Sequence, residues 1–162
     1  MGGGERFDEL IKSVVVYLKD GVKKGEYHIG EKELIVNDDS IRYKDPSVEI
    51  GASVWGKMLF VKHKDVIEKF EELHGSVVRM KIDIDDVYVY FDFDSEYPRV
   101  KLKSVLYGEL GYYIRDIKKI KQLLIEVLKL LPEFKEKIDQ FLREYKEELS
   151  KIYKVIHEYL SK

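Results

Sequence analysis

The sequence predicts a single α+β domain in which helices cover one face of an antiparallel sheet. Two changes of hydrophobic period carry this prediction. Apolar residues recur with a helical period near both ends of the chain, whereas from Glu26 to Tyr107 they largely alternate with polar residues, as in strands. The length of 162 residues is within the usual size of one domain, so we expect one domain over residues 1–162.

Helical spacing predicts the first helix over residues 5–24. Charged residues such as Asp8 and Lys12 lie opposite its apolar stripe. Gly21 and Gly25 leave the position of its end open. The stripe consists of Phe7, Leu10, Ile11, Val14, Leu18 and Val22.

Residues 26–62 are rich in short strands that alternate with turn residues. A short helix follows over 65–74, with Asp65 as its N-cap and Gly75 at its exit. No structure is assigned to 51–56. The strands expected in this region are 27–29, 34–36, 41–43, 48–50 and 58–61.

Residues 77–107 alternate most clearly and predict a three-stranded β-meander, which completes a sheet of about seven strands. Asp85 and Asp86 form the two-residue turn of its first hairpin. That turn places every apolar residue of the hairpin on one face. The opposite face then pairs Arg79 with Asp92, Lys81 with Tyr90, and Asp83 with Tyr88.

Residues 110–161 predict a pair of long amphipathic helices packed on the sheet. The first helix runs from Leu110 to Leu131. Pro132 breaks or kinks the pattern, at a position suited to the first turn of a second helix. The apolar spacing mixes threes and fours without strict heptads, which favours a short straight packing over a long coiled coil.

Composition excludes several kinds of chemistry. The chain has no Cys and no Thr, which removes disulfides, thiolate nucleophiles, Cys-ligated metals and threonine nucleophiles. Few amides together with abundant Lys and Glu are typical of hyperthermophile proteins.

A formal net charge of −2 argues against coating nucleic acid by bulk charge. No apolar run is long enough to span a bilayer and no signal-peptide core is present, so we expect a cytoplasmic protein.

No catalytic centre is predicted. The histidines His28, His63, His74 and His157 show no metal-ligand spacing and no Gly-flanked serine nearby. The acidic runs at 83–86 and 92–96 fit exposed turns better than a metal site. Glycine spacing matches no phosphate-binding loop. We therefore expect no metal, no cofactor and no catalytic residues, and favour a non-enzymatic protein.

Two surfaces are candidates for binding. The leading hypothesis is self-association or docking of a protein partner through the last helices, with Tyr145, Tyr153 and Tyr159 at the interface. The alternative is single-stranded nucleic acid on the polar sheet face, where rings would stack on bases and cations would follow phosphates. A third possibility is a small-molecule or lipid pocket between sheet and helices. The nucleic-acid residues would be Arg79, Lys81, Tyr88, Tyr90, Lys101 and Lys103.

One short segment resembles a known family. Residues 30–43, Gly-Glu-Lys-Glu-Leu-Ile-Val-Asn-Asp-Asp-Ser-Ile-Arg-Tyr, are similar to a strand–acidic turn–strand unit of bacterial pleckstrin-homology-like domains. The helix at 65–74 and the C-terminal helices depart from that pattern. The sequence therefore assigns no family.

Overall fold

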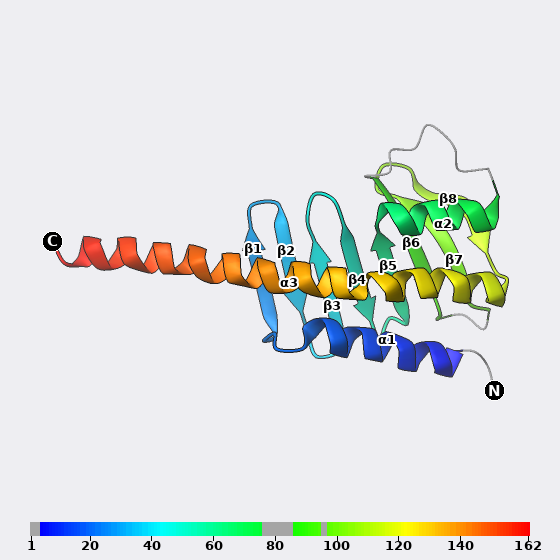
Figure 1. The fold of residues 1–162 in the computed structure, drawn as a ribbon, viewed down its shortest axis with the longest axis horizontal. Coiled ribbons are helices and arrows are strands. Elements are labelled where there is room, and N and C mark those ends of the chain that lie inside the picture. Colours follow the sequence, from blue (N-terminus) through cyan, green and yellow to red (C-terminus); the bar gives the residue numbers. More distant parts are fainter. Residues whose placement is uncertain (1–3, 76–85, 95–96) are drawn as a thin grey trace.

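The computed structural model describes residues 4–75, 86–94 and 97–162 and confirms the α+β class (Figure 1). Three helices and eight strands make up the described part of the chain. Its helices are α1 (Gly4–Lys19), α2 (Lys64–His74) and α3 (Ile117–Leu160). Its strands are β1 (Gly25–Ile29), β2 (Lys32–Val36), β3 (Ser40–Lys44), β4 (Glu49–Ser53), β5 (Met58–Lys62), β6 (Val87–Asp92), β7 (Arg99–Ser104) and β8 (Gly108–Ile114).

All eight strands form one antiparallel sheet in which each strand pairs with the next along the chain. Alternation within the strands sorts their side chains onto two faces. In β6, Val87, Val89 and Phe91 are buried, while Tyr88 and Tyr90 lie on the other face and are half-buried. The predicted sorting of this strand is therefore confirmed.

The first strand of the predicted hairpin, residues 77–84, lies outside the described residues. This segment includes Arg79 and Lys81 of the predicted nucleic-acid surface. In the described chain, β6 pairs with β5 on one edge and with β7 on the other. Asp92, which we expected opposite Arg79, lies opposite Arg99 and forms an ion pair with it at 3.2 Å.

The eighth strand corrects the prediction of a helix that begins at Leu110. Leu110 and Ile114 are four residues apart, a spacing that places two residues on the same face of either a helix or a strand, so over so short a stretch it does not separate the two. Gly108 and Gly111 have φ values of 69° and 76°, a conformation that interrupts a helix. The chain therefore stays extended until Asp116, whose side chain accepts a hydrogen bond from the Lys118 backbone N–H and caps α3.

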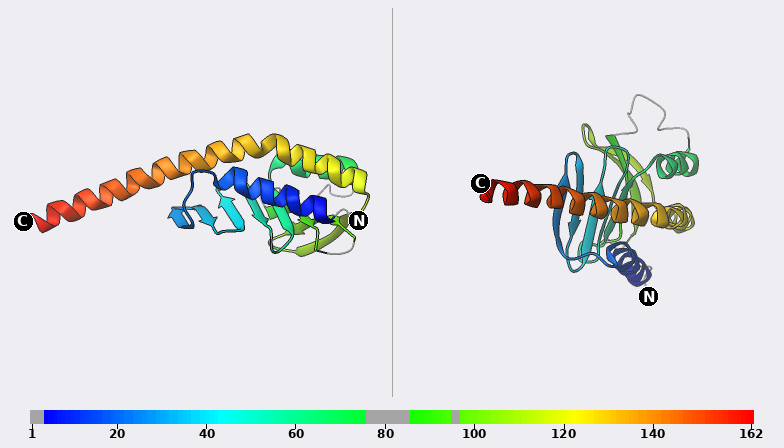
Figure 2. Two further views of the ribbon diagram at one scale, coloured as in Figure 1. Left: turned by 90° about the horizontal axis from the view of Figure 1, so that it is seen from below. Right: turned by 60° about the vertical axis from the view of Figure 1, so that its left-hand side comes forward.

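All three helices cover one face of the sheet, and α3 lies between α1 and α2 (Figures 1 and 2). The core lies between this helical layer and the inward-facing residues of the strands. It includes Leu34, Ile50 and Leu102 from the sheet together with Ile11 and Phe134 from the helices.

The C-terminal helical pair is corrected to one continuous helix. The α3 helix has 44 residues and passes through Pro132 without a break. Pro removes one backbone hydrogen bond and costs about 3 kcal/mol inside a helix. Buried residues on both sides of it, Val127, Leu131, Phe134 and Ile138, keep the helix on the sheet. The α3 helix bends in its yellow-to-orange part (Figure 2), as helices commonly do at a proline.

Two predicted helix boundaries also shift. The α1 helix ends at Lys19 rather than residue 24, because Gly21 takes a φ of 75°. The α2 helix begins at Lys64, and its N-cap is His63 rather than Asp65. The His63 Nδ1 atom accepts the Asp65 backbone N–H at 3.1 Å.

Candidate interaction site at the end of α3

The last part of α3 extends beyond the sheet. Figure 1 shows its red end far past β1, the first strand of the sheet. We name residues 146–162 the projecting segment. Each of its residues is exposed except Leu149, which is half-buried. At about 1.5 Å per residue, these 17 residues extend roughly 25 Å from the body of the protein.

The projecting segment exposes an apolar surface. Six of its large apolar side chains are between 48% and 77% exposed. Isolated apolar side chains are normal on a protein surface, whereas a contiguous apolar patch is typical of an interaction site. The six residues are Ile152, Tyr153, Val155, Ile156, Tyr159 and Leu160.

The apolar residues follow a heptad repeat. From Leu142 to Tyr159 the spacing alternates three and four, as at the a and d positions of a coiled coil. Flanking apolar residues such as Phe141, Tyr153 and Leu160 obscure this alternation when the whole helical region is considered at once. The a and d positions are Leu142, Tyr145, Leu149, Ile152, Ile156 and Tyr159.

The same stripe of α3 contacts the sheet before it reaches the edge. Ile138 is fully buried, and the Phe141 ring lies edge-on to Tyr43 of β3 at 6.1 Å. The Tyr145 ring meets Tyr27 of β1 at 5.1 Å, also edge-on. Beyond Tyr145 the sheet ends and the stripe continues without it.

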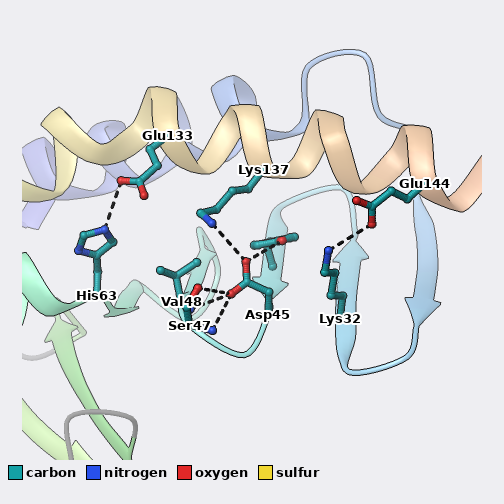
Figure 3. A network of polar contacts seen from close by, with 9 residues as sticks. Lys32, Asp45, Ser47, Val48, His63, Glu133, Lys137 and Glu144 are labelled. Carbon is teal, nitrogen blue, oxygen red and sulfur yellow. Dashed lines mark hydrogen bonds and ion pairs between the residues drawn. The ribbon is translucent and has the colours of Figure 1, made fainter.

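Polar contacts hold α3 on the sheet just before it projects (Figure 3). Glu133 lies 3.2 Å from His63, Lys137 3.6 Å from Asp45, and Glu144 3.2 Å from Lys32. On the other side of the helix, Lys135 donates to the backbone carbonyls of Leu18 and Asp20, at the end of α1. These contacts fix the direction in which α3 leaves the body.

Asp45 is the most buried member of this network. It lies in the β3–β4 turn and accepts hydrogen bonds from the Ser47 and Val48 backbone N–H groups, at 2.8 and 2.9 Å, and from the Ser47 hydroxyl. The Tyr43 hydroxyl donates to it at 2.9 Å. Burial alone would raise the pKa of Asp45, but the hydrogen bonds outweigh it and lower this pKa below its usual 3.8. Burial and the bond to Asp45 raise the pKa of Tyr43.

The three predicted interface tyrosines differ from one another in exposure. Tyr153 and Tyr159 are exposed on the projecting segment. Tyr145 is half-buried against β1 at the root of that segment. Ile152 and Ile156 were not among the interface residues predicted from the sequence, although their heptad spacing is the signal that selects them.

The polar sheet face holds the described residues of the predicted nucleic-acid surface. The Tyr88 hydroxyl donates to Glu49 Oε1 at 2.8 Å, and burial followed by this bond raises the pKa of Tyr88. Lys101 Nζ lies 2.7 Å from Glu109 Oε1. Lys103 Nζ lies over the Tyr90 ring at 4.6 Å. Carboxylates thus compensate part of the positive charge that phosphates would require.

Phe60, Glu49 and Arg42 also belong to this face and were not predicted from the sequence, because they come from strands outside the predicted hairpin. Phe60 lies between Tyr88 and Tyr90, with ring centroids 5.9 and 6.4 Å away. Glu49 is only 1% exposed and also binds Arg42 Nε at 2.9 Å. No local sequence signal identifies these neighbours, because they depend on the pairing of β3, β4, β5 and β6.

Replacing Gly51 by Ala should destabilise the sheet face. A Cβ atom at Gly51 would lie 2.2 Å from Cζ of Phe60, so the ring must move away from its two tyrosine neighbours. We expect a loss of about 1–3 kcal/mol in the free energy of unfolding, measured by urea denaturation. In the double variant Gly51→Ala/Phe60→Ala, the loss should be smaller than the sum of the two single losses. Additive losses would contradict close packing of Phe60 on Gly51.

A hollow of about 380 Å³ lies between α3 and the β2–β4 region, where the third hypothesis places a ligand. Charged groups line much of it, including Lys32, Asp45, Glu133 and Lys137, and these already form ion pairs with one another or with neighbours. Such a lining does not suit a lipid tail.

The described residues contain neither a metal-binding cluster nor a helix that could span a membrane. Within residues 4–75, 86–94 and 97–162, no group of three or more His, Asp or Glu side chains is arranged to hold a metal ion. In the same ranges, no helix is both long and apolar enough to cross a bilayer.

Comparison with known proteins gives no relative: no family model, no curated protein and no solved structure matches the chain.

Proposed function

We propose that the chain is a protein-interaction module that self-associates through the projecting segment. The exposed heptad stripe, which continues the sheet-facing side of α3 past the edge strand β1, is the observation that carries this proposal. It supports the leading sequence hypothesis and identifies Ile152 and Ile156 as central residues beside Tyr153 and Tyr159.

A helical segment that extends into water beyond the body of the protein loses the packing that stabilises most protein helices. Isolated helices shorter than about 12–15 residues are marginal, and most helical stability in proteins comes from burying an apolar face. The projecting segment is about that length and has no face buried against the described body. Association would supply the missing burial, and a second copy carries the same apolar stripe.

The expected affinity is modest. Two helices that overlap by about 25 Å make an interface at the low end of the specific size range. We therefore expect a dissociation constant on the order of micromolar rather than nanomolar.

Sedimentation velocity over a wide concentration range tests this function. The wild type should change from monomer to dimer as concentration rises, and Ile156→Glu should weaken association by about a hundredfold or more. The reason is that a carboxylate would be buried without a partner in each copy.

Ile125→Glu is the matched control. Ile125 lies on the same helix and is 49% exposed, against 48% for Ile156, but it lies over the body. We expect it to associate like the wild type. Monomeric wild type at every concentration, or equal effects of the two substitutions, would refute the proposed function.

A further inference from the structure

We infer that two copies pair antiparallel, with a two-fold axis at Lys154 of the projecting segment; this inference rests on the proposed function. The orientation follows from where the sheet lies relative to the stripe. The register follows from how much of α3 is exposed and from the charges beside the stripe.

A parallel pair is blocked by the body of the protein. The a and d positions of the projecting segment lie on the same side of α3 as Ile138 and Tyr145, which face the sheet. If two copies aligned side by side in the same direction, both β1 strands would occupy the space between the two helices. The helices could then not approach the 8–10 Å that helix packing requires.

An antiparallel pair avoids this clash. The two helices run in opposite directions and overlap at their C-terminal ends, so that the two bodies lie at opposite ends of the pair. Overlap of residues 146–162 with the same residues of the second copy uses the full exposed length. The C-terminal end of one helix then reaches the β1 edge of the other copy. At that point the apolar stripe of the other copy is covered by its own sheet.

This register matches apolar layers. In antiparallel coiled coils the a positions of one helix meet the d positions of the other. With the axis at Lys154, Ile152 lies opposite Ile156 of the second copy, and Leu149 lies opposite Tyr159 of the second copy. Each layer occurs twice because of the two-fold symmetry, and the paired patch is isologous, so assembly stops at a dimer.

The residues beside the stripe are also complementary. Val155 meets Val155 of the second copy, and Tyr153 meets Tyr153 of the second copy on the other flank. Toward the ends, Glu148 lies level with Lys162 of the second copy, which follows the end of α3 at Leu160. This opposite-charge pair occurs twice. Moving the overlap by one heptad toward the body would require Leu142 and Tyr145, which already pack on the sheet, to enter the interface.

Single-cysteine variants test orientation directly, because the natural chain has no Cys. Under mild oxidation, Val155→Cys should form a disulfide-linked dimer rapidly, since the two residues meet near the axis. Leu149→Cys should not, because the two copies of residue 149 are ten residues apart along the pair, about 15 Å. In a parallel pair, Leu149→Cys would link and Val155→Cys would not.

Each result of the oxidation experiment decides between arrangements. Faster linkage at residue 155 than at 149 supports the antiparallel pair. Faster linkage at 149, equal rates, or no linkage in a protein that sediments as a dimer overturns it and leaves the proposed function intact. A wild type that never dimerises refutes the proposed function itself.

Charge exchange tests the register without cysteine. Glu148→Lys and Lys162→Glu should each raise the dissociation constant, on the order of tenfold because two pairs are lost per dimer. The double variant should restore affinity to within about threefold of the wild type. Glu148 also pairs with Lys151 of its own helix at 3.4 Å, but Lys162→Glu leaves that pair intact. Additive weakening in the double variant would contradict this register.

Discussion

A chain that ends at Glu147 is expected to fold with the intrinsic stability of the monomer and to stay monomeric at every concentration. The residues removed, 148–162, are exposed apart from Leu149, so their loss uncovers no core. They contain the four residues of the proposed a–d layers. Sedimentation velocity of this chain beside the full-length protein gives the loss of association.

Thermal unfolding of the same two chains adds an independent result. Because association stabilises the folded state by mass action, the midpoint of the full-length chain should rise with protein concentration. The midpoint of the shortened chain should not depend on concentration. A shortened chain that still dimerises would place the interface on the body. One that unfolds at much lower temperature even in dilute solution would show that the segment stabilises its own domain.

Asp45→Ala should cause the largest loss of stability among substitutions in the polar network that holds α3 on the sheet. It leaves the buried Tyr43 hydroxyl and the Val48 backbone N–H without their acceptor and removes the partner of Lys137. Leaving buried polar groups unsatisfied costs about 1–3 kcal/mol each, so we expect a loss of about 3–5 kcal/mol in the free energy of unfolding. Denaturant unfolding at neutral pH measures this loss.

The pair between Lys32 and Glu144 provides the control for Asp45. Both side chains are more than a third exposed, and solvent screens such a pair. Lys32→Ala should therefore change stability by less than about 1 kcal/mol. Equal losses for Asp45→Ala and Lys32→Ala would contradict the buried role assigned to Asp45.

Asp45 should also contribute to acid sensitivity. Its pKa is lower in the folded protein than its usual 3.8, so the unfolded chain binds more protons in this range. The stabilising contribution is therefore complete well above pH 4 and declines as pH falls through the folded pKa, from about pH 5 downward. Asp45→Asn keeps an acceptor but does not titrate. Its free energy of unfolding should fall less steeply than that of the wild type between pH 5 and pH 2, and an equal slope would contradict this account.

The sequence was sufficient to predict the elements whose hydrophobic pattern is regular. These are α1, α2, β6 and β7, whose local patterns agree with the tertiary packing. Pro132 was misleading because local propensity predicts a break, whereas buried residues on both sides offset its cost. The stretch that includes Leu110 was misleading because few residues separate a period of two from one of 3.6.

The candidate site depends on contacts that sequence alone does not give. The apolar stripe of α3 looks the same before and after Tyr145, and only the position of β1 decides which part is covered. Likewise, Glu49 meets Tyr88 because β4, β5 and β6 are neighbours in the sheet, although 39 residues separate the two along the chain. Periodicity predicts a surface, whereas topology decides whether that surface is buried.

Hydrogen exchange of the projecting segment, measured at several protein concentrations, tests the central claim most directly. Amides of residues 148–160 should be well protected in concentrated solution and should exchange rapidly in dilute solution, because an unpaired helix end frays. The amides of Phe134, Ile138 and Phe141, which lie on the core, should be protected equally at both extremes apart from global unfolding. If protection of residues 148–160 does not change with concentration, no second copy covers the projecting segment, and self-association through it is contradicted.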